Sequence, residues 1–200
     1  MITSAIPTRP MVGSFTQSLL EHQAVFARLA ALQPQVEAAA RTLSHCLRSG
    51  GKLMLCGNGG SAADCQHLAA ELTGRFVHDR RPLAAMALTT DTSALTCIAN
   101  DYAFDQVFVR QVQGLGRPGD CLLALSTSGR SANVLQAVEV ATGLGLHTIG
   151  LLGGDGGLLR ERCQQAVVVP STTTARIQEA HIFIGHTLCG LIEEALGLRD

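Results

Sequence analysis

This chain of 200 residues contains no tryptophan, and aromatic residues make up only 4% of it. A core without large rings must be aliphatic, and the 46% of hydrophobic residues suffices for one full-sized core. No apolar stretch approaches the roughly 18 residues that a membrane span needs, so we expect no membrane partner. Long lysine or arginine runs are also missing and the net charge is −1, which argues against a nucleic-acid partner.

Two further absences bear on location. The first 17 residues lack the basic start and the apolar segment of an export signal. The seven cysteines are scattered through apolar segments, and no two of them form a Cys-x-x-Cys pair. Small buried thiols of this kind are typical of a reducing compartment. The sequence therefore predicts a cytoplasmic protein.

The chain begins with a short segment, 1–14, that carries two prolines and no periodicity, which predicts a loose N-terminus. Two amphipathic helices are expected within 15–49, at 15–32 and 36–47, with a break near Gln33-Pro34. Strands and helices alternate over 50–200. No linker is long enough to divide the chain, so we predict one domain over 1–200.

Five short runs in the second part are apolar throughout, as strands covered on both faces are. These runs lie at 53–56, 84–88, 121–125, 148–152 and 166–169, and helices are expected at 62–76, 93–99, 104–115, 132–144 and 176–196. The order predicts a three-layer, doubly wound α/β fold with a parallel sheet and helices on both faces. Ligands of such folds bind at the carboxyl ends of the strands.

Two loops rich in small residues fall at those carboxyl ends. In the first, Cys56-Gly-Asn-Gly-Gly-Ser-Ala62, glycines let the backbone approach a ligand, and N–H groups at the helix start favour an anion. The second, Ser126-Thr-Ser-Gly-Arg-Ser131, offers four hydroxyls, whereas a helix N-cap needs only one. Without a P-loop lysine, it suits a sugar phosphate better than a nucleoside triphosphate.

A dinucleotide site is the alternative for the first loop, because Gly57-x-Gly59-x-x-Ala62 matches the relaxed dinucleotide fingerprint. That interpretation requires an acidic residue at the end of the next strand, and Asp91 lies about three residues beyond it. It also leaves the hydroxyl cluster without a role. NAD-type binding is therefore the weaker hypothesis.

His67 and Glu71 stand four residues apart on a predicted helix, so they share one face. They would bind a metal, work as a base with a neighbouring imidazole, or form a solvated ion pair, and the spacing does not choose between these. On the last helix, Gln178 and His186 are separated by about 12 Å of rise and would reach one ion only if it lay between them.

Three other features have ordinary interpretations. Taken alone, His181 and His186 on the last helix are each expected to be packed residues rather than ligands. The glycine-rich segment 153–157 predicts a turn after the fourth strand. Asn100-Asp101 follows a short predicted helix, where it would cap the next helix or present an amide and a carboxylate to substrate hydroxyls.

Taken together, these motifs resemble the sugar isomerase (SIS) domain family, most closely its phosphoheptose isomerases, over nearly the whole chain. The stretches that carry the likeness are Cys56-Gly-Asn-Gly-Gly-Ser61, His67-x-x-x-Glu71-Leu-Thr-Gly-Arg75, Asn100-Asp101, Ser126-Thr-Ser-Gly-x-Ser131-Ala-Asn133 and Arg176-Ile-Gln178-Glu179-x-His181-x-x-x-x-His186. The resemblance implies a five-stranded parallel sheet of the flavodoxin-like kind and a homotetramer with its sites near subunit contacts. One departure is Ala175, where some members of the family have aspartate.

The resemblance also implies roles for particular residues. The phosphate-binding residues would be Ser126, Thr127, Ser128 and Ser131, and the sugar site would be lined by Asn58, Gly59, Gly60, Ser61, Glu71, Asn100, Asp101 and Gln178. One zinc per subunit would be held by His67, Glu71, Gln178 and His186. The implied activity converts sedoheptulose 7-phosphate to glycero-manno-heptose 7-phosphate, and feeds heptose into surface polysaccharide.

The chemistry fits a carboxylate and an imidazole. Ketose–aldose isomerisation moves a proton between adjacent carbons through an enediol, so it needs a base at carbon and an acid at the oxygens. By resemblance these are Glu71 and His186. Two alternatives stay open: a non-catalytic relative that binds a replication initiator, which would lack this pair, and an enzyme acting on another sugar phosphate.

Overall fold

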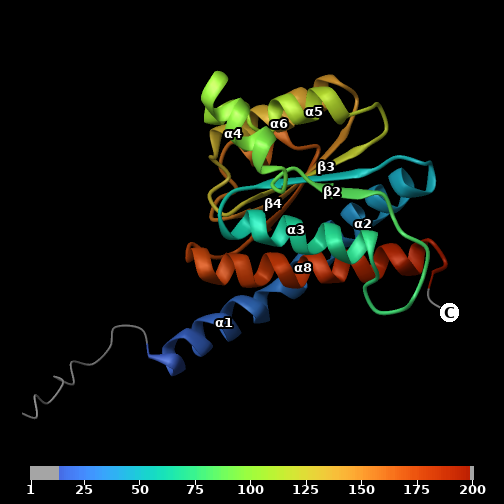
Figure 1. The fold of residues 1–200 in the computed structure, drawn as a ribbon. Coiled ribbons are helices and arrows are strands. Elements are labelled where there is room, and N and C mark those ends of the chain that lie inside the picture. Colours follow the sequence, from blue (N-terminus) through green and yellow to red (C-terminus); the bar gives the residue numbers. More distant parts are fainter. Residues whose placement is uncertain (1–13, 199–200) are drawn as a thin grey trace, which may run out of the picture.

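The computed structural model describes residues 14–198 (Figure 1). The predicted loose N-terminus, apart from Ser14, lies outside the described residues. Ser14 is the N-cap of the first helix, α1 (Phe15–Leu29), and its hydroxyl accepts a hydrogen bond from the Gln17 N–H at 3.1 Å. This bond satisfies one of the N–H groups that a helix start leaves free.

A five-stranded parallel sheet forms the middle layer, in the order β2-β1-β3-β4-β5. The strands are β1 (Leu53–Gly57), β2 (Ala85–Ala87), β3 (Cys121–Ser126), β4 (His147–Gly153) and β5 (Gln165–Val169). The chain reverses its direction of winding between β1 and β3, which pair with Gly57 opposite Leu125. The loops after these two strands therefore leave the same edge of the sheet as neighbours. The predicted doubly wound fold is confirmed.

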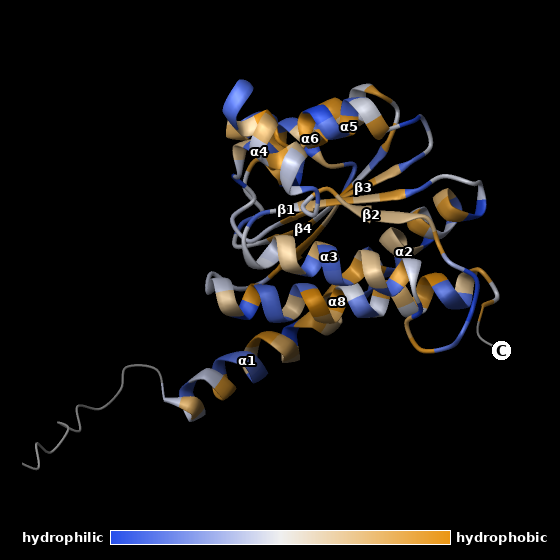
Figure 2. Cartoon of the chain, viewed as in Figure 1, coloured by the Kyte–Doolittle hydropathy of each residue, from blue (hydrophilic) through white to orange (hydrophobic). Residues whose placement is uncertain are grey.

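Helices cover both faces of the sheet (Figure 1). One layer holds α2 (Gln33–Arg48), α3 (Gly60–Thr73) and α8 (Thr174–Ala195), while the other holds α4 (Thr92–Asp101), α5 (Val109–Leu115), α6 (Ala132–Gly143) and the short α7 (Leu159–Arg162). Figure 2 shows strands in mainly hydrophobic colours between helices of mixed colour. Successive residues of β1 alternate between the two cores, with Leu55 in the first and Met54 in the second.

The positions of the elements follow the prediction, but some boundaries differ. The helix expected at 104–115 is a 3₁₀ turn, Phe104–Gln106, followed by α5. The helix expected at 62–76 begins at Gly60 and ends at Thr73, where Gly74 follows. The segment 153–157 is a turn as predicted, but the four-residue helix α7 after it was not foreseen. Asn100 and Asp101 close α4 rather than follow it.

Two observations concern the surroundings of the chain. Among residues 14–198, no helix has both the length and the apolarity that crossing a bilayer requires. All seven cysteines carry free thiols, and six of them are buried. Burial raises the pKa of Cys163 and that of Cys189 to about 12, so both stay protonated and unreactive near neutral pH.

Candidate active site

The first glycine loop lies directly against α8. Gly59, the N-cap of α3, has a φ of +57°, a conformation that favours glycine. A Cβ on Gly60 would lie 2.3 Å from Nε2 of Gln178, so only glycine leaves room for this amide. The fold thus brings Gln178, 118 positions away in the sequence, to the start of α3. The two regions assigned to the sugar site are adjacent.

A pair of amides joins the first loop to the second. Asn58 donates to Oδ1 of Asn133 at 2.9 Å, and Asn133 returns a hydrogen bond of the same length to Oδ1 of Asn58. Asn133 is buried at the start of α6, and its Oδ1 also accepts from the Val134 N–H. The pair joins the loops that follow β1 and β3, at the switch point of the sheet where ligands of this fold class bind.

The second loop leaves the start of α6 free for a ligand. Ser126 accepts a hydrogen bond from the Gly129 N–H at 3.1 Å, and its hydroxyl lies 3.3 Å from that of Ser131. Ser131 occupies the N-cap position of α6 but makes no side-chain capping bond. Simple capping therefore does not account for this hydroxyl cluster. Because the Val134 N–H already donates to Oδ1 of Asn133, the N–H groups of Ala132 and Asn133 are the ones that α6 offers to an anion.

The turn after β4 braces the second loop from the side. Arg130 forms two hydrogen bonds with the carboxylate of Asp155, at 2.8 and 2.6 Å, and it also donates to the Ser128 carbonyl at 3.0 Å. The guanidinium holds the pKa of Asp155 well below its usual value. Both side chains are exposed, so this pair contributes little to stability and acts mainly on the shape of the loop.

A cluster of three side chains joins α3 to α8, which lie side by side (Figure 1). The Nε2 atoms of His67 and His186 are 2.8 Å apart, and Nε2 of His67 lies 3.4 Å from a carboxylate oxygen of Glu71. One ligand atom from each of the three lies within 4.8 Å of the others. The sequence spacing had left His67 and Glu71 open to three interpretations, and the arrival of His186 disfavours a mere surface ion pair.

This donor set fits a zinc ion. Two imidazole nitrogens and a carboxylate oxygen are ligands that zinc takes, and a catalytic zinc commonly has three protein ligands and an open position. At 2.8 Å, one of the two rings must carry a proton on Nε2 toward the other, and a cation would replace that proton. The fourth ligand implied by the resemblance is Gln178, whose amide lies beside Gly60. Gly60 precedes His67 by about two turns of α3, so the amide is not part of the three-residue cluster, and its role as a ligand stays a prediction.

Comparison with known proteins places the chain. The family model for the SIS domain matches residues 19–153. The chain belongs to the SIS domain family. Among curated relatives, the phosphoheptose isomerase of Rhodospirillum rubrum is 57% identical over 86% of this chain and 91% of that protein. The phosphoheptose isomerase of a Nitratiruptor species is 54% identical over 92% of this chain and 100% of its own length.

Solved structures agree with this SIS assignment. The phosphoheptose isomerase of Neisseria gonorrhoeae has a TM-score of 0.80 and 48% identity, over 90% of this chain and 95% of its own. That of Francisella tularensis has a TM-score of 0.84 and 40% identity, with the same coverage. The resemblance to phosphoheptose isomerases and the prediction of an aldose–ketose isomerase are confirmed.

The structure bears on three further features of the sequence, Asn100-Asp101, His181 and Asn133. Asn100 donates to Oδ1 of Asp101 at 2.8 Å, which lowers the pKa of Asp101, and both are exposed on α4. Their contact with sugar stays a prediction. His181 is a packed residue as expected, because its Nε2–H donates to the Leu152 carbonyl at 3.1 Å and burial lowers its pKa to about 4. Asn133 belongs to the motif that begins at Ser126, but nothing in the sequence predicts its hydrogen bonds with Asn58.

Proposed function

We propose that this SIS protein converts sedoheptulose 7-phosphate into D-glycero-D-manno-heptose 7-phosphate through an enediol. The observation that carries the proposal is the meeting of Glu71 and His186 from separate helices in one cluster, which supplies a carboxylate and an imidazole. The names of the relatives support the substrate class. A non-catalytic scaffold that binds a replication initiator would have no need of this pair.

The proposed reaction moves one proton between two carbons. The Glu71 carboxylate removes a proton from C1 of the ketose while His186 donates a proton to the C2 oxygen, which gives the enediol. Glu71 then delivers its proton to C2, and the proton of the C1 hydroxyl returns to His186, leaving an aldehyde at C1. Both residues end in their starting protonation states, so the cycle is balanced.

The proposed cofactor is one zinc per subunit, held by His67, Glu71 and His186, with Gln178 as the fourth ligand implied by the family. When bound, zinc would supply a Lewis acid that polarises substrate oxygens. The residues of the chain orient the sugar: Gln178 and the glycine loop from one side, and the hydroxyl loop from the phosphate end.

The phosphate loop gives a separate prediction. Ser128→Ala should weaken binding of the sugar phosphate about tenfold or more, since a hydrogen bond to a charged group contributes roughly 1.5–3 kcal/mol. Stability should hardly change, because Ser128 is exposed. Calorimetry with sedoheptulose 7-phosphate and with plain sedoheptulose measures both effects, and Ser93→Ala on α4 is the matched control.

The two ligands separate the hypotheses. Plain sedoheptulose should bind poorly to the parent protein and lose little more on Ser128→Ala. If the parent binds the phosphorylated and the plain sugar equally well, the hydroxyl loop does not hold phosphate.

We further propose a homotetramer working in the cytoplasm, with the product used for lipopolysaccharide or another surface polysaccharide. The free, buried thiols support the cytoplasmic location, which is a reducing compartment.

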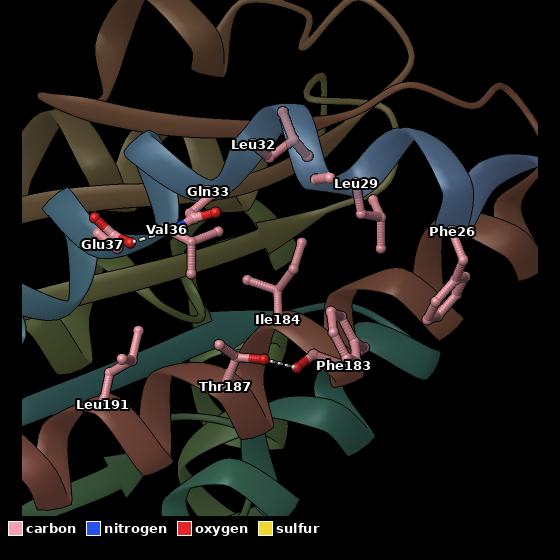
Figure 3. A pocket seen from close by; sticks show the side chains of 11 residues that line it. Phe26, Leu29, Leu32, Gln33, Val36, Glu37, Phe183, Ile184, Thr187 and Leu191 are labelled. Carbon is pink, nitrogen blue, oxygen red and sulfur yellow. Dashed lines mark hydrogen bonds between the residues drawn. The ribbon is translucent and has the colours of Figure 1, made fainter.

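The homotetramer is supported by an apolar groove of about 450 Å³ between α1, α2 and α8, which holds none of the proposed site residues (Figure 3). Phe26 and Phe183 stand at one end of it, with ring centroids 5.4 Å apart. Phe183 is 49% exposed and Phe15 on α1 is 83% exposed, so a large apolar surface lacks cover in one subunit.

Phe183→Glu should therefore disrupt the tetramer, because it places a charge on that apolar surface. Light scattering coupled to size exclusion should give about 84 kDa for the parent, four times 21.0 kDa, and a smaller mass for the variant. Phe104→Glu, at an exposed position of the opposite layer, is the control and should keep the parent mass. A parent that elutes as a monomer would refute the assembly.

A further inference from the structure

A fully buried ion pair lies behind the cluster of His67, Glu71 and His186. Nε of Arg80, in the segment after α3, donates to the Glu193 carboxylate of α8 at 2.8 Å. The side chains are 2% and 0% exposed. Removing two charges from water can cost more than their attraction returns, so such a pair is weak evidence for stability alone. Its contacts indicate a different role.

Arg80 binds the end of the helix that carries Glu71. Its Nη2 donates to the carbonyl of Glu71 itself at 2.7 Å, and its Nη1 donates to the carbonyls of Leu72 at 2.8 Å and Gly74 at 2.9 Å. The last carbonyls of a helix have no partner within it, and a positive charge at this end also interacts favourably with the helix dipole. The guanidinium thus fixes the backbone from which the Glu71 side chain extends.

Glu193 is linked to His186 through Phe76. It follows His186 by seven residues on α8, about two helical turns, and so lies on the same face. The carboxylate oxygen that binds Arg80 also accepts the Phe76 N–H at 3.4 Å. The Phe76 ring stacks on the His186 ring, with centroids 5.5 Å apart and planes at 25°. One carboxylate therefore anchors the residue that packs against the His186 imidazole.

We propose that Arg80 and Glu193 are positioning residues that fix Glu71 and His186 relative to each other. The inference rests on the proposed function, because it takes these two as the reacting pair. The hydrogen bonds of Arg80 and Glu193 go to each other and to residues 71–81, outside the loops assigned to the substrate, so their effect falls on the geometry of the chemical step. A misplacement of about 1 Å in a reacting group lowers rates by up to about 10²-fold.

The test uses Glu193→Gln, which keeps shape and removes charge, and Arg80→Lys, which keeps charge and loses the planar fork. In the full-length enzyme with zinc supplied, kcat for sedoheptulose 7-phosphate should fall about 10- to 100-fold, while KM stays within about twofold. A purely structural pair would lower the melting temperature and leave the kcat of the folded protein unchanged.

Asp120→Asn is the matched control. Asp120 is buried, pairs with Lys52 and accepts the backbone N–H groups of Lys52 and Arg117 at 2.9 and 2.8 Å. Lys52 and Asp120 directly precede β1 and β3, so this pair lies at the amino ends of these strands, away from the two loops at their carboxyl ends. This variant should also lose thermal stability, but kcat should stay at the parent value. Both melting temperature and kcat are compared across the variants, so the loss of rate is judged at similar loss of stability.

A second measurement does not depend on turnover. Zinc affinity, followed by competition with a coloured chelator, should fall about 10- to 100-fold in Glu193→Gln and in Arg80→Lys, and should not change in Asp120→Asn. A parent that binds zinc but does not isomerise the sugar would refute the proposed function. The zinc affinities of the variants would then decide whether Arg80 and Glu193 are positioning residues. If both variants keep the parent kcat and zinc affinity within twofold, or if Asp120→Asn loses them equally, the positioning role is wrong. A parent with neither activity nor zinc overturns both proposals.

Discussion

Replacing Glu71 by glutamine should lower kcat for sedoheptulose 7-phosphate by about 10²–10⁴-fold, the usual contribution of a positioned acid or base. The amide has nearly the size of the carboxylate but cannot accept the proton from C1. Because the Glu71 side chain is partly exposed in a cluster between two helices, the fold should survive. Steady-state kinetics on the purified variant measures the loss, and circular dichroism checks the fold.

Glu139→Gln is the matched control, since Glu139 is an exposed carboxylate on α6 whose partner is Arg162. It should retain the parent kcat. Glu71→Gln with turnover near that of the parent would remove Glu71 from the role of base, whatever the resemblance implies.

Replacing His186 by glutamine should have an effect of similar size, about 10²–10⁴-fold on kcat, because the proton donor at the substrate oxygens is lost. The same change removes one imidazole from the donor set, so zinc should be lost too. Elemental analysis of protein purified without chelators should find up to one zinc per chain in the parent and much less in the variant. His147→Gln, at an exposed position of β4, should change neither value.

The two readouts of His186→Gln can disagree. Lost activity with full zinc occupancy would mean that His186 acts as an acid and is not a zinc ligand. Retained activity would exclude it from the reacting pair.

The sheet could be predicted from the sequence because its signal is local. Runs such as 53–56 and 121–125 are apolar throughout, as strands buried on both faces are. The expected bounds of the five strands therefore differ from the observed ones by no more than one residue at any end. The short helix α7 could not be predicted, because four residues are too few to show a helical period. Thr73 ends α3 at the point where Arg80 binds its carbonyls, a contact that no pattern within the helix reveals.

The site was foreseen as two loops and several polar residues, but not as a geometry. The four-residue spacing of His67 and Glu71 placed them on one face, while the arrival of His186 depends on how α3 packs against α8. The Asn58–Asn133 pair and the Arg130–Asp155 brace join residues 75 and 25 positions apart. Arg80 lies among charged residues next to a proline, a composition typical of a solvated loop, and only the fold shows that it is buried.

One measurement tests the central claim most directly. The zinc-supplied protein is incubated with sedoheptulose 7-phosphate in deuterated water, and the product is followed by proton NMR. We expect the anomeric signal of D-glycero-D-manno-heptose 7-phosphate to appear, with deuterium at C2 to the extent that the proton held by Glu71 exchanges with solvent. If no heptose aldose forms above the rate without protein, this SIS chain is not a sedoheptulose 7-phosphate isomerase.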